Sequence, residues 1–214
     1  EDISFKNGFV WHKNQKTDLD WVALVQAAYL KRVSLSEHAH YATPGVHFDW
    51  ATAKGHPFAY HVYGVAAVQV TVDCLRGIYE VDFVKTVHDF GQSMNTAVDY
   101  GQIEGGIVQG LGWMTMEEIV YDAEGRLRSN ALSNYKIPDI YSVPKILDIV
   151  PLETARENLA IFSSKAVGEP PLMYGIGAYF AIRDAVRAFN REVSPAFDAP
   201  FATEKVLMNL YAKK

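Results

Sequence analysis

The stretch Gly101-Gln102-Ile103-Glu104-Gly105-Gly106-Ile107-Val108-Gln109-Gly110-Leu111-Gly112 carries two opposing signals. Its large apolar residues recur at helical spacing, which predicts a helix between Asn95 and Glu117. Five glycines lie in the same stretch, and each weakens a helix interior by about 1 kcal/mol relative to alanine. The missing side chains must therefore serve either very close packing against another element or a ligand that lies against the backbone. The pattern alone favours close packing.

A second segment, Ser163-Ser164-Lys165-Ala166-Val167-Gly168-Glu169-Pro170-Pro171, leads into a helix predicted from Tyr174 to Asn190. We expect Pro170 to push Glu169 out of the α region and Gly168 to allow an unusual dihedral before it. The Glu169 carboxylate would then be held near a helix N-terminus, where local dipoles stabilise the anion and leave it ready to accept a proton. The residues alone favour a simpler role, that of a carboxylate capping a helix.

The first residues of the glycine-rich stretch also suit a ligand. Backbone N–H groups and the Gln102 amide could lie there against a polar group with several hydrogen-bond acceptors. The spacing is not that of a nucleotide site, because neither a GxGxxG fingerprint nor the GK[ST] ending of a P-loop occurs in the chain.

The remaining segments alternate hairpin and helix signals without a regular βαβ rhythm. This predicts an α+β fold of hairpin-rich mixed sheets packed on a few helices in two-layer subdomains. Asn7-Gly8 between two alternating runs predicts a hairpin over residues 3–11. Residues 18–31 are expected to form an amphipathic helix, with Thr17 before them in a start that resembles a capping box.

Alternating apolar residues over 65–73 and 78–88 predict a two-stranded hairpin. The irregular stretch 33–61, rich in His and aromatic residues, predicts a long excursion with short strands. Further elements are expected later in the chain, namely strands near residues 146–150 and 159–162 and a last short helix capped by Thr203.

The composition is that of a globular chain. The 214 residues are 49% apolar and 21% charged, which excludes a disordered protein or a disulfide scaffold. With a net charge of −5 and dispersed Lys and Arg, we expect no nucleic-acid partner. The longest apolar run, residues 174–182, is too short to span a membrane, so we expect no membrane association.

The single cysteine, Cys74, cannot form an internal disulfide, and we expect a cytoplasmic protein. The first residues show neither an initiator Met nor a signal-peptide pattern, so we expect the chain to begin within a longer protein. His38-Ala39-His40 would place two imidazoles on one face of a strand, but no third ligand stands at a recognisable spacing, so no zinc site is expected. The other histidines are expected in loops or as hydrogen-bonded core residues: His12, His47, His56, His61 and His88.

Together the two segments resemble the xanthine dehydrogenase and aldehyde oxidase family of molybdenum hydroxylases, in the C-terminal part of the molybdenum-binding subunit. The Lys165–Pro171 and Gly101–Gly106 strings are highly specific as a pair. Thr96 departs from the pattern, because the family usually has proline there. The matches run from about residue 32 to about residue 190, and the other matching strings are Arg32–Ser36, Tyr63–Ala66, Val87–Gly91, Ser93–Asn95 and Ser133–Pro138.

This resemblance implies a molybdopterin cofactor that hydroxylates an electron-poor carbon of a purine or an aldehyde with oxygen from water. Glu169 matches the catalytic general base, which would take the proton from the attacking oxygen. The substrate carbon would give up a hydride, whose two electrons reduce Mo(VI) to Mo(IV). Gln102 matches a glutamine that contacts the pterin, and Gly101 and Lys165 are expected beside it as cofactor-binding residues. No residue of this chain is expected to ligate the metal.

The resemblance also implies partners. Residues 1–214 would be the C-terminal portion of a molybdopterin-binding domain, in three parts: a hairpin and helix over 1–32, a sheet and the glycine-rich helix over 33–117, and a β region with C-terminal helices over 118–214. The remaining molybdenum and pterin contacts would come from the rest of the molybdenum-binding subunit. The 2Fe-2S clusters and FAD would be bound by other domains or subunits, and the full complex is expected to be a homo-oligomer.

Three functions remain open. A hydroxylase acting on a purine (hypoxanthine or xanthine) is preferred, on the closeness of the match alone. The alternatives are an aldehyde-oxidising molybdenum hydroxylase and a non-catalytic assembly module that retains the fold. The isolated chain is expected neither to hold the cofactor nor to turn over.

Overall fold

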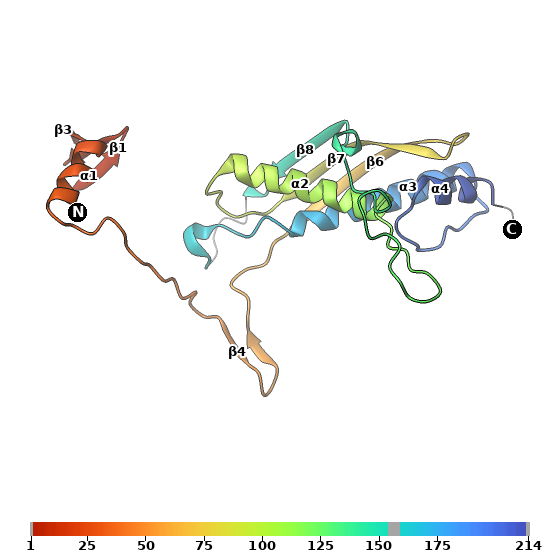
Figure 1. Cartoon of the computed structure of the whole chain (residues 1–214), viewed down its shortest axis with the longest axis horizontal. Helices are drawn as coiled ribbons and strands as arrows, with labels where there is room; N and C mark the ends of the chain where they lie inside the picture. Colours follow the sequence, from red (N-terminus) through yellow and green to blue (C-terminus); the bar gives the residue numbers. More distant parts are fainter. Residues whose placement is uncertain (1, 154–158, 213–214) are drawn as a thin grey trace. The chain divides into compact units, whose positions relative to one another are not determined.

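The computed structural model describes residues 2–153 and 159–212. The chain divides into two compact units, Glu1–Ala42 and Thr43–Lys214. Small antiparallel and mixed sheets occur together with helices, and this confirms the predicted α+β class (Figure 1).

The first unit is a three-stranded antiparallel sheet followed by a helix. Asn7 and Gly8 have left-handed φ angles of 51° and 77°, which suit the two-residue loop of a hairpin. The predicted hairpin at this position is confirmed. The elements are β1 (Ile3–Lys6), β2 (Phe9–His12), β3 (Gln15–Asp20) and α1 (Trp21–Leu30).

The helix predicted over residues 18–31 begins later than expected. Thr17 lies in β3, where its hydroxyl donates to the Val10 carbonyl at 2.7 Å. Asp20 caps α1 instead, because its Oδ1 accepts the Ala23 N–H at 2.7 Å. None of the α1 residues is buried, so strand pairing and the cap, not an apolar face, fix the first residue of this helix.

The second unit is built on a sheet of β6 (Gly64–Asp73), β7 (Ile78–His88) and β8 (Ile146–Pro151). β6 and β7 form the predicted antiparallel hairpin, and β8 pairs with β7 in parallel. A parallel neighbour requires a crossover connection, and here the connection contains the glycine-rich helix. A separate hairpin of β4 (His47–Asp49) and β5 (Lys54–His56) supplies the short strands predicted within residues 33–61.

The glycine-rich stretch forms the helix α2 (Thr96–Thr115), as predicted. Its cap is Asn95, whose Oδ1 accepts the Val98 N–H at 3.3 Å. The later helices are α3 (Ile176–Phe189) and α4 (Thr203–Leu210), and the described 3₁₀ turns are η1 (Ile140–Ser142), η3 (Ile161–Ser163) and η4 (Pro170–Gly175).

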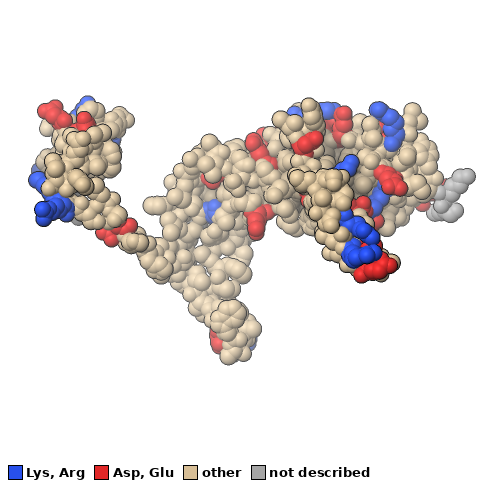
Figure 2. All heavy atoms as spheres, in the orientation of Figure 1, with Lys and Arg blue, Asp and Glu red and all other residues tan. Residues whose placement is uncertain are grey.

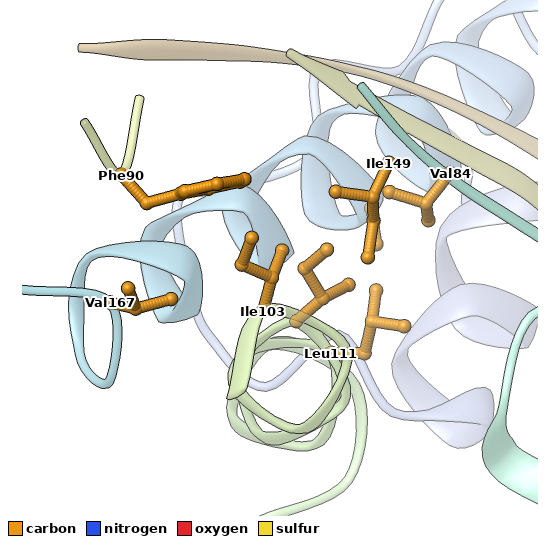
Figure 3. Close-up of a cluster of buried hydrophobic side chains, with 8 residues drawn as sticks. Val84, Phe90, Ile103, Leu111, Ile149 and Val167 are labelled. Atoms are coloured by element: carbon orange, nitrogen blue, oxygen red, sulfur yellow. The ribbon is translucent and has the colours of Figure 1, made fainter. Parts of the chain in front are cut away.

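One hydrophobic cluster lies between α2 and the sheet. Figure 3 shows Ile103 of α2 pointing toward Phe90, and Leu111 of the same helix pointing toward the sheet residues Ile149 and Val84. Val167, from the segment before Glu169, belongs to the same cluster. Residues from the two predicted parts 33–117 and 118–214 therefore pack into one hydrophobic core.

A second cluster joins α3 and α4 to the end of α2. Ala178, Ile182 and Val186 of the predicted apolar stripe are buried, whereas Phe189 is half exposed. The buried members of this cluster are Met114, Tyr179, Ile182, Val186, Phe201, Val206 and Leu210.

The glycines of α2 divide into two groups. A Cβ on Gly110 would lie 2.0 Å from the Leu172 carbonyl oxygen, and one on Gly106 would lie 3.0 Å from Pro171 Cβ. By contrast, Gly101 and Gly105 face open space, with no neighbouring atom within 4 Å of an added Cβ. Close packing is thus confirmed at Gly106 and Gly110, whereas the backbone at Gly101 and Gly105 is open and a ligand there stays a prediction.

Two further expectations are wrong. The strand predicted near residues 159–162 is not formed, because Phe162 and Ser163 have left-handed φ angles of 52° and 56° and belong to the turn η3. Thr203 does not cap the last helix, since it is the first helical residue and the cap position falls on Ala202.

Charged side chains of both signs are interspersed on the face shown in Figure 2. Within residues 2–153 and 159–212, no helix is both long enough and apolar enough to cross a membrane.

The close packing can be tested by adding one methyl group. Gly110→Ala forces a Cβ into the Leu172 carbonyl and is expected to lower the free energy of unfolding by about 1–3 kcal/mol. Gly105→Ala is the matched control, because its Cβ meets open space and alanine favours the helix, so it should raise that free energy by up to about 1 kcal/mol. Urea unfolding of the purified chain measures both. Equal effects from the two substitutions would contradict the packing.

Candidate functional site

The two segments singled out in the sequence lie against each other. The turn η4, which begins directly after Glu169, packs along the glycine face of α2 at Gly106 and Gly110. A Cβ on Gly168 would lie 3.7 Å from Gln102 Oε1. The residue before Glu169 and the side chain of Gln102 are therefore neighbours, although 66 positions separate Gly168 from Gln102 in the chain.

The backbone of Glu169 differs from the expectation. Its φ of −96° and ψ of −35° lie in the α region, and Gly168 has no left-handed φ. A residue before proline is disfavoured in this region but not forbidden, and the Leu172 N–H bonds the Glu169 carbonyl at 3.0 Å to close the turn. The Glu169 side chain makes no capping hydrogen bond and is exposed, so the capping role favoured by the residues alone is not observed.

Lys165 lies near the start of the segment 163–171 and is buried. Its Nζ lies 2.5 Å from Asp89 Oδ2 and 2.9 Å from the His61 carbonyl oxygen. The side chains of Lys165 and Asp89 are 5% and 0% exposed. These contacts are internal, and cofactor binding by Lys165 stays a prediction.

Tyr174, in the turn η4 that begins near the end of this segment, makes a second contact, with β7. Its hydroxyl lies 2.6 Å from Nδ1 of His88, a fully buried residue at the end of β7. Gly64 makes room for this contact, because a Cβ there would lie 1.6 Å from the Tyr174 hydroxyl. The stretch from Lys165 to Tyr174 is thus fastened to β7 and its neighbouring residues at both ends.

Burial sets the charge of these groups. Desolvation lowers the pKa of His88 below its ordinary value of 6.5, although the nearby Asp89 carboxylate opposes the shift. Desolvation raises the pKa of Tyr174, and Asp89 adds to that effect. A neutral imidazole and a neutral phenol therefore form this contact at neutral pH.

Sequence reasoning missed the supporting residues Asp89, Tyr174 and Gly64. It did expect His88 to be a hydrogen-bonded core histidine, and this is confirmed for its Nδ1. A signal for Asp89 existed, since it lies inside the matching string Val87–Gly91, but nothing in the sequence linked it to Lys165.

A molybdopterin group fits the open part of this site. The backbone at Gly101 and Gly105 is bare of neighbouring atoms. Gln102, exposed between them, carries an amide that both donates and accepts hydrogen bonds. A flat heterocycle with polar edges suits such a surface, and Gln102 and Gly101 would hold it.

A different part of α2 lines a cavity of about 600 Å³. The lining includes Leu111, Gly112 and Thr115, together with Asn134 and Lys136 from the string Ser133–Pro138. It includes none of Gly101, Gln102, Lys165 or Glu169. Gly101, Gln102 and Glu169 are exposed outside this cavity, whereas Lys165 is buried. Within the described parts of the chain no group of three or more His, Cys, Asp or Glu could hold a metal ion.

Comparison with known proteins identifies the family. Residues 1–144 match the family described as molybdopterin cofactor-binding domain. The chain therefore belongs to the molybdopterin cofactor-binding domain family, and its predicted resemblance to the molybdenum hydroxylases is confirmed. Glu169 lies C-terminal to the residues matched by this family.

Individual relatives extend the match. Xanthine dehydrogenase/oxidase of Rattus norvegicus is 42% identical over 200 residues, which cover 91% of this chain and 15% of that protein. Aldehyde oxidase 1 of Oryctolagus cuniculus is 37% identical over 199 residues, with the same coverage of 91% and 15%. Quinoline 2-oxidoreductase from Pseudomonas putida 86 matches in structure with a TM-score of 0.68 and 28% identity, over 100% of this chain and 26% of that chain. The chain thus spans about 15% of the length of the first two relatives.

The buried histidine predicts a pH dependence of stability. Because the pKa of His88 is lowered in the folded chain, the unfolded chain binds the proton more readily, and the stability present above the unfolded pKa near 6.5 is lost as the pH falls. Between about pH 7.5 and about pH 5, the free energy of unfolding of the natural chain should fall more steeply than that of His88→Gln. Urea unfolding across this range measures both slopes, and parallel curves would contradict the burial of a neutral imidazole.

Proposed function

We propose that this chain supplies part of the active site of a molybdenum hydroxylase, with Glu169 as the general base and Gln102 and Gly101 as cofactor contacts. The observation that carries the proposal is the approach of the Glu169 segment to Gln102 beside a bare helix surface. Two motifs that are remote in sequence meet where one group could touch both.

The side chains suit these roles. The Gln102 amide can donate one hydrogen bond and accept another along a pterin edge. Glu169 has an exposed carboxylate that makes no capping bond, so its oxygens can accept a proton. Pro170 and the close contact of η4 with α2 restrict the backbone that carries it. When bound, the molybdenum cofactor supplies Lewis acidity and accepts two electrons.

Hydroxylation of a purine such as hypoxanthine or xanthine is the preferred reaction, supported by the higher identity to xanthine dehydrogenase/oxidase than to aldehyde oxidase 1. An aldehyde remains the alternative substrate. A non-catalytic assembly module is less well supported, because Glu169 has no capping bond that would explain it structurally.

Partners follow from the same proposal. The rest of the molybdenum-binding subunit would complete the cofactor site, and domains or subunits with 2Fe-2S and FAD would carry electrons away in a cytoplasmic homo-oligomer. The apolar helix α1 supports a protein partner, since Trp21, Val22, Tyr29 and Leu30 are each more than half exposed.

The base is tested by Glu169→Gln in the complete enzyme. The amide keeps the shape of the side chain but cannot take the proton, so kcat for xanthine should fall by about 10²–10⁴-fold while the molybdenum content stays unchanged. Glu192→Gln is the control, because that exposed glutamate lies in the turn after α3 whereas Glu169 lies before that helix, and it should leave kcat unchanged. Steady-state kinetics and metal analysis measure both, and near-normal turnover by Glu169→Gln would refute the role.

The cofactor contact is tested by Gln102→Ala in the same enzyme. Losing one or two neutral hydrogen bonds should weaken cofactor retention by about 3–10-fold. Gln109→Ala, an exposed glutamine two turns later on α2, should retain the cofactor as the natural enzyme does. Molybdenum remaining after gel filtration in mild denaturant measures the difference. Equal retention by the two variants would remove Gln102 from the site.

A further inference from the structure

A buried ion pair lies beneath the loop that carries Glu169. Asp89 Oδ2 and Lys165 Nζ are 2.5 Å apart, and both side chains are almost completely withdrawn from solvent. We propose that Asp89 and Lys165 are positioning residues for Glu169, whose side chain they hold in place through the backbone of residues 165–169. This inference rests on the proposed function of Glu169 as the base.

The pair is oriented by further hydrogen bonds. Lys165 Nζ also donates to the His61 carbonyl at 2.9 Å, and Asp89 Oδ1 accepts the Gly91 N–H at 3.0 Å. The two backbone segments that carry the pair are also hydrogen bonded to each other, because the Lys165 N–H donates to the Phe90 carbonyl at 3.0 Å. The position of the ammonium group is therefore fixed from several directions.

The connection from Lys165 to Glu169 is short and held at each step. The Ala166 N–H donates to the Tyr60 hydroxyl at 3.0 Å. Val167 is buried in the cluster between α2 and the sheet (Figure 3). Gly168 lies beside Gln102. Three residues, each with a defined contact, therefore connect Lys165 to Glu169, and a shift at Lys165 would disturb the contacts that lead to Glu169.

Residues 165–169 have no regular secondary structure of their own. Apart from the Lys165–Phe90 backbone bond beside the isolated bridge of Gly91 and Ser164, no ladder hydrogen bonds fix them, so tertiary contacts must. A buried ion pair is a weak source of net stability, because desolvation of the two charges offsets their attraction and an apolar pair often serves as well. Placement of the loop is a role that an apolar pair, which has no directional bonds, would not perform.

The test uses the complete enzyme with the double variant Asp89→Asn/Lys165→Met. Removing both charges leaves no uncompensated buried charge, so the melting temperature should stay near that of the natural enzyme. Rates are expressed per bound molybdenum, so a cofactor contact made by Lys165 would not enter the comparison. The loop loses its fixed point, and kcat should fall about 10–100-fold with KM within about twofold, as expected when a reacting group is misplaced by about 1 Å. Asp89→Glu, which keeps the charges but lengthens one side chain, should also lower kcat.

An exposed ion pair provides the control. Lys85 Nζ and Asp148 Oδ2 are 2.9 Å apart on β7 and β8, with side chains 51% and 44% exposed. The double variant Lys85→Met/Asp148→Asn should leave kcat and KM unchanged. If Asp89→Asn/Lys165→Met or Asp89→Glu also keeps the natural kcat, the buried pair is only structural and the proposal is overturned.

A cycle with Glu169 separates this inference from the proposed function. In a Glu169→Gln enzyme, adding Asp89→Asn/Lys165→Met should lower the residual rate no further, because the pair acts only through the missing carboxylate. An additional loss of the same size as in the natural background would overturn the positioning role while leaving Glu169 as the base. Natural activity in Glu169→Gln alone would refute the proposed function instead.

Discussion

The approach of two backbones, at Gly110 on α2 and at Gly175 where η4 ends, determines where the rest of the candidate site can lie. A Cβ on Gly175 would be 2.0 Å from the Gly110 carbonyl carbon, so neither position has room for a side chain. Because η4 begins one residue after Glu169, this contact fixes the distance of the acid from α2. The same helix carries Gln102 at its other end, two turns before Gly110. The packing of η4 against α2 therefore determines how Glu169 and Gln102 are placed relative to each other.

Two kinds of environment meet at this loop. Beneath it, Asp89 and Lys165 are buried and bonded to each other, and His88 is buried and bonded through its Nδ1. Above it, Gln102 and Glu169 are exposed and make none of these internal contacts. Internal hydrogen bonds offset the desolvation of most buried polar groups, although Nε2 of His88 is buried without a partner among the described residues. A base, by contrast, must keep a free oxygen. These two requirements explain why the residues that hold the loop are buried, whereas the residues proposed to act on the cofactor and substrate are exposed.

Local patterns were sufficient for much of the fold. Alternation predicted the hairpin of β6 and β7, Asn7-Gly8 predicted the first turn, and apolar spacing predicted α2 in spite of its glycines. The patterns could not separate Gly110, which needs close packing, from Gly105, which faces open space, because that depends on η4 from a remote part of the chain. Nor could they pair Asp89 with Lys165, since a buried ion pair leaves no periodic signal. The α-region backbone of Glu169 was missed for the same reason, as a tertiary contact outweighs the local preference before proline.

The most direct measurement is a crystal structure of the complete protein with its molybdopterin cofactor bound. The account predicts that the cofactor lies against the bare backbone at Gly101 and Gly105, with the Gln102 amide in hydrogen-bond contact and the Glu169 carboxylate facing the same group. A cofactor seated in the cavity lined by Leu111 and Lys136, or a Glu169 side chain on a surface that the cofactor does not reach, would contradict it.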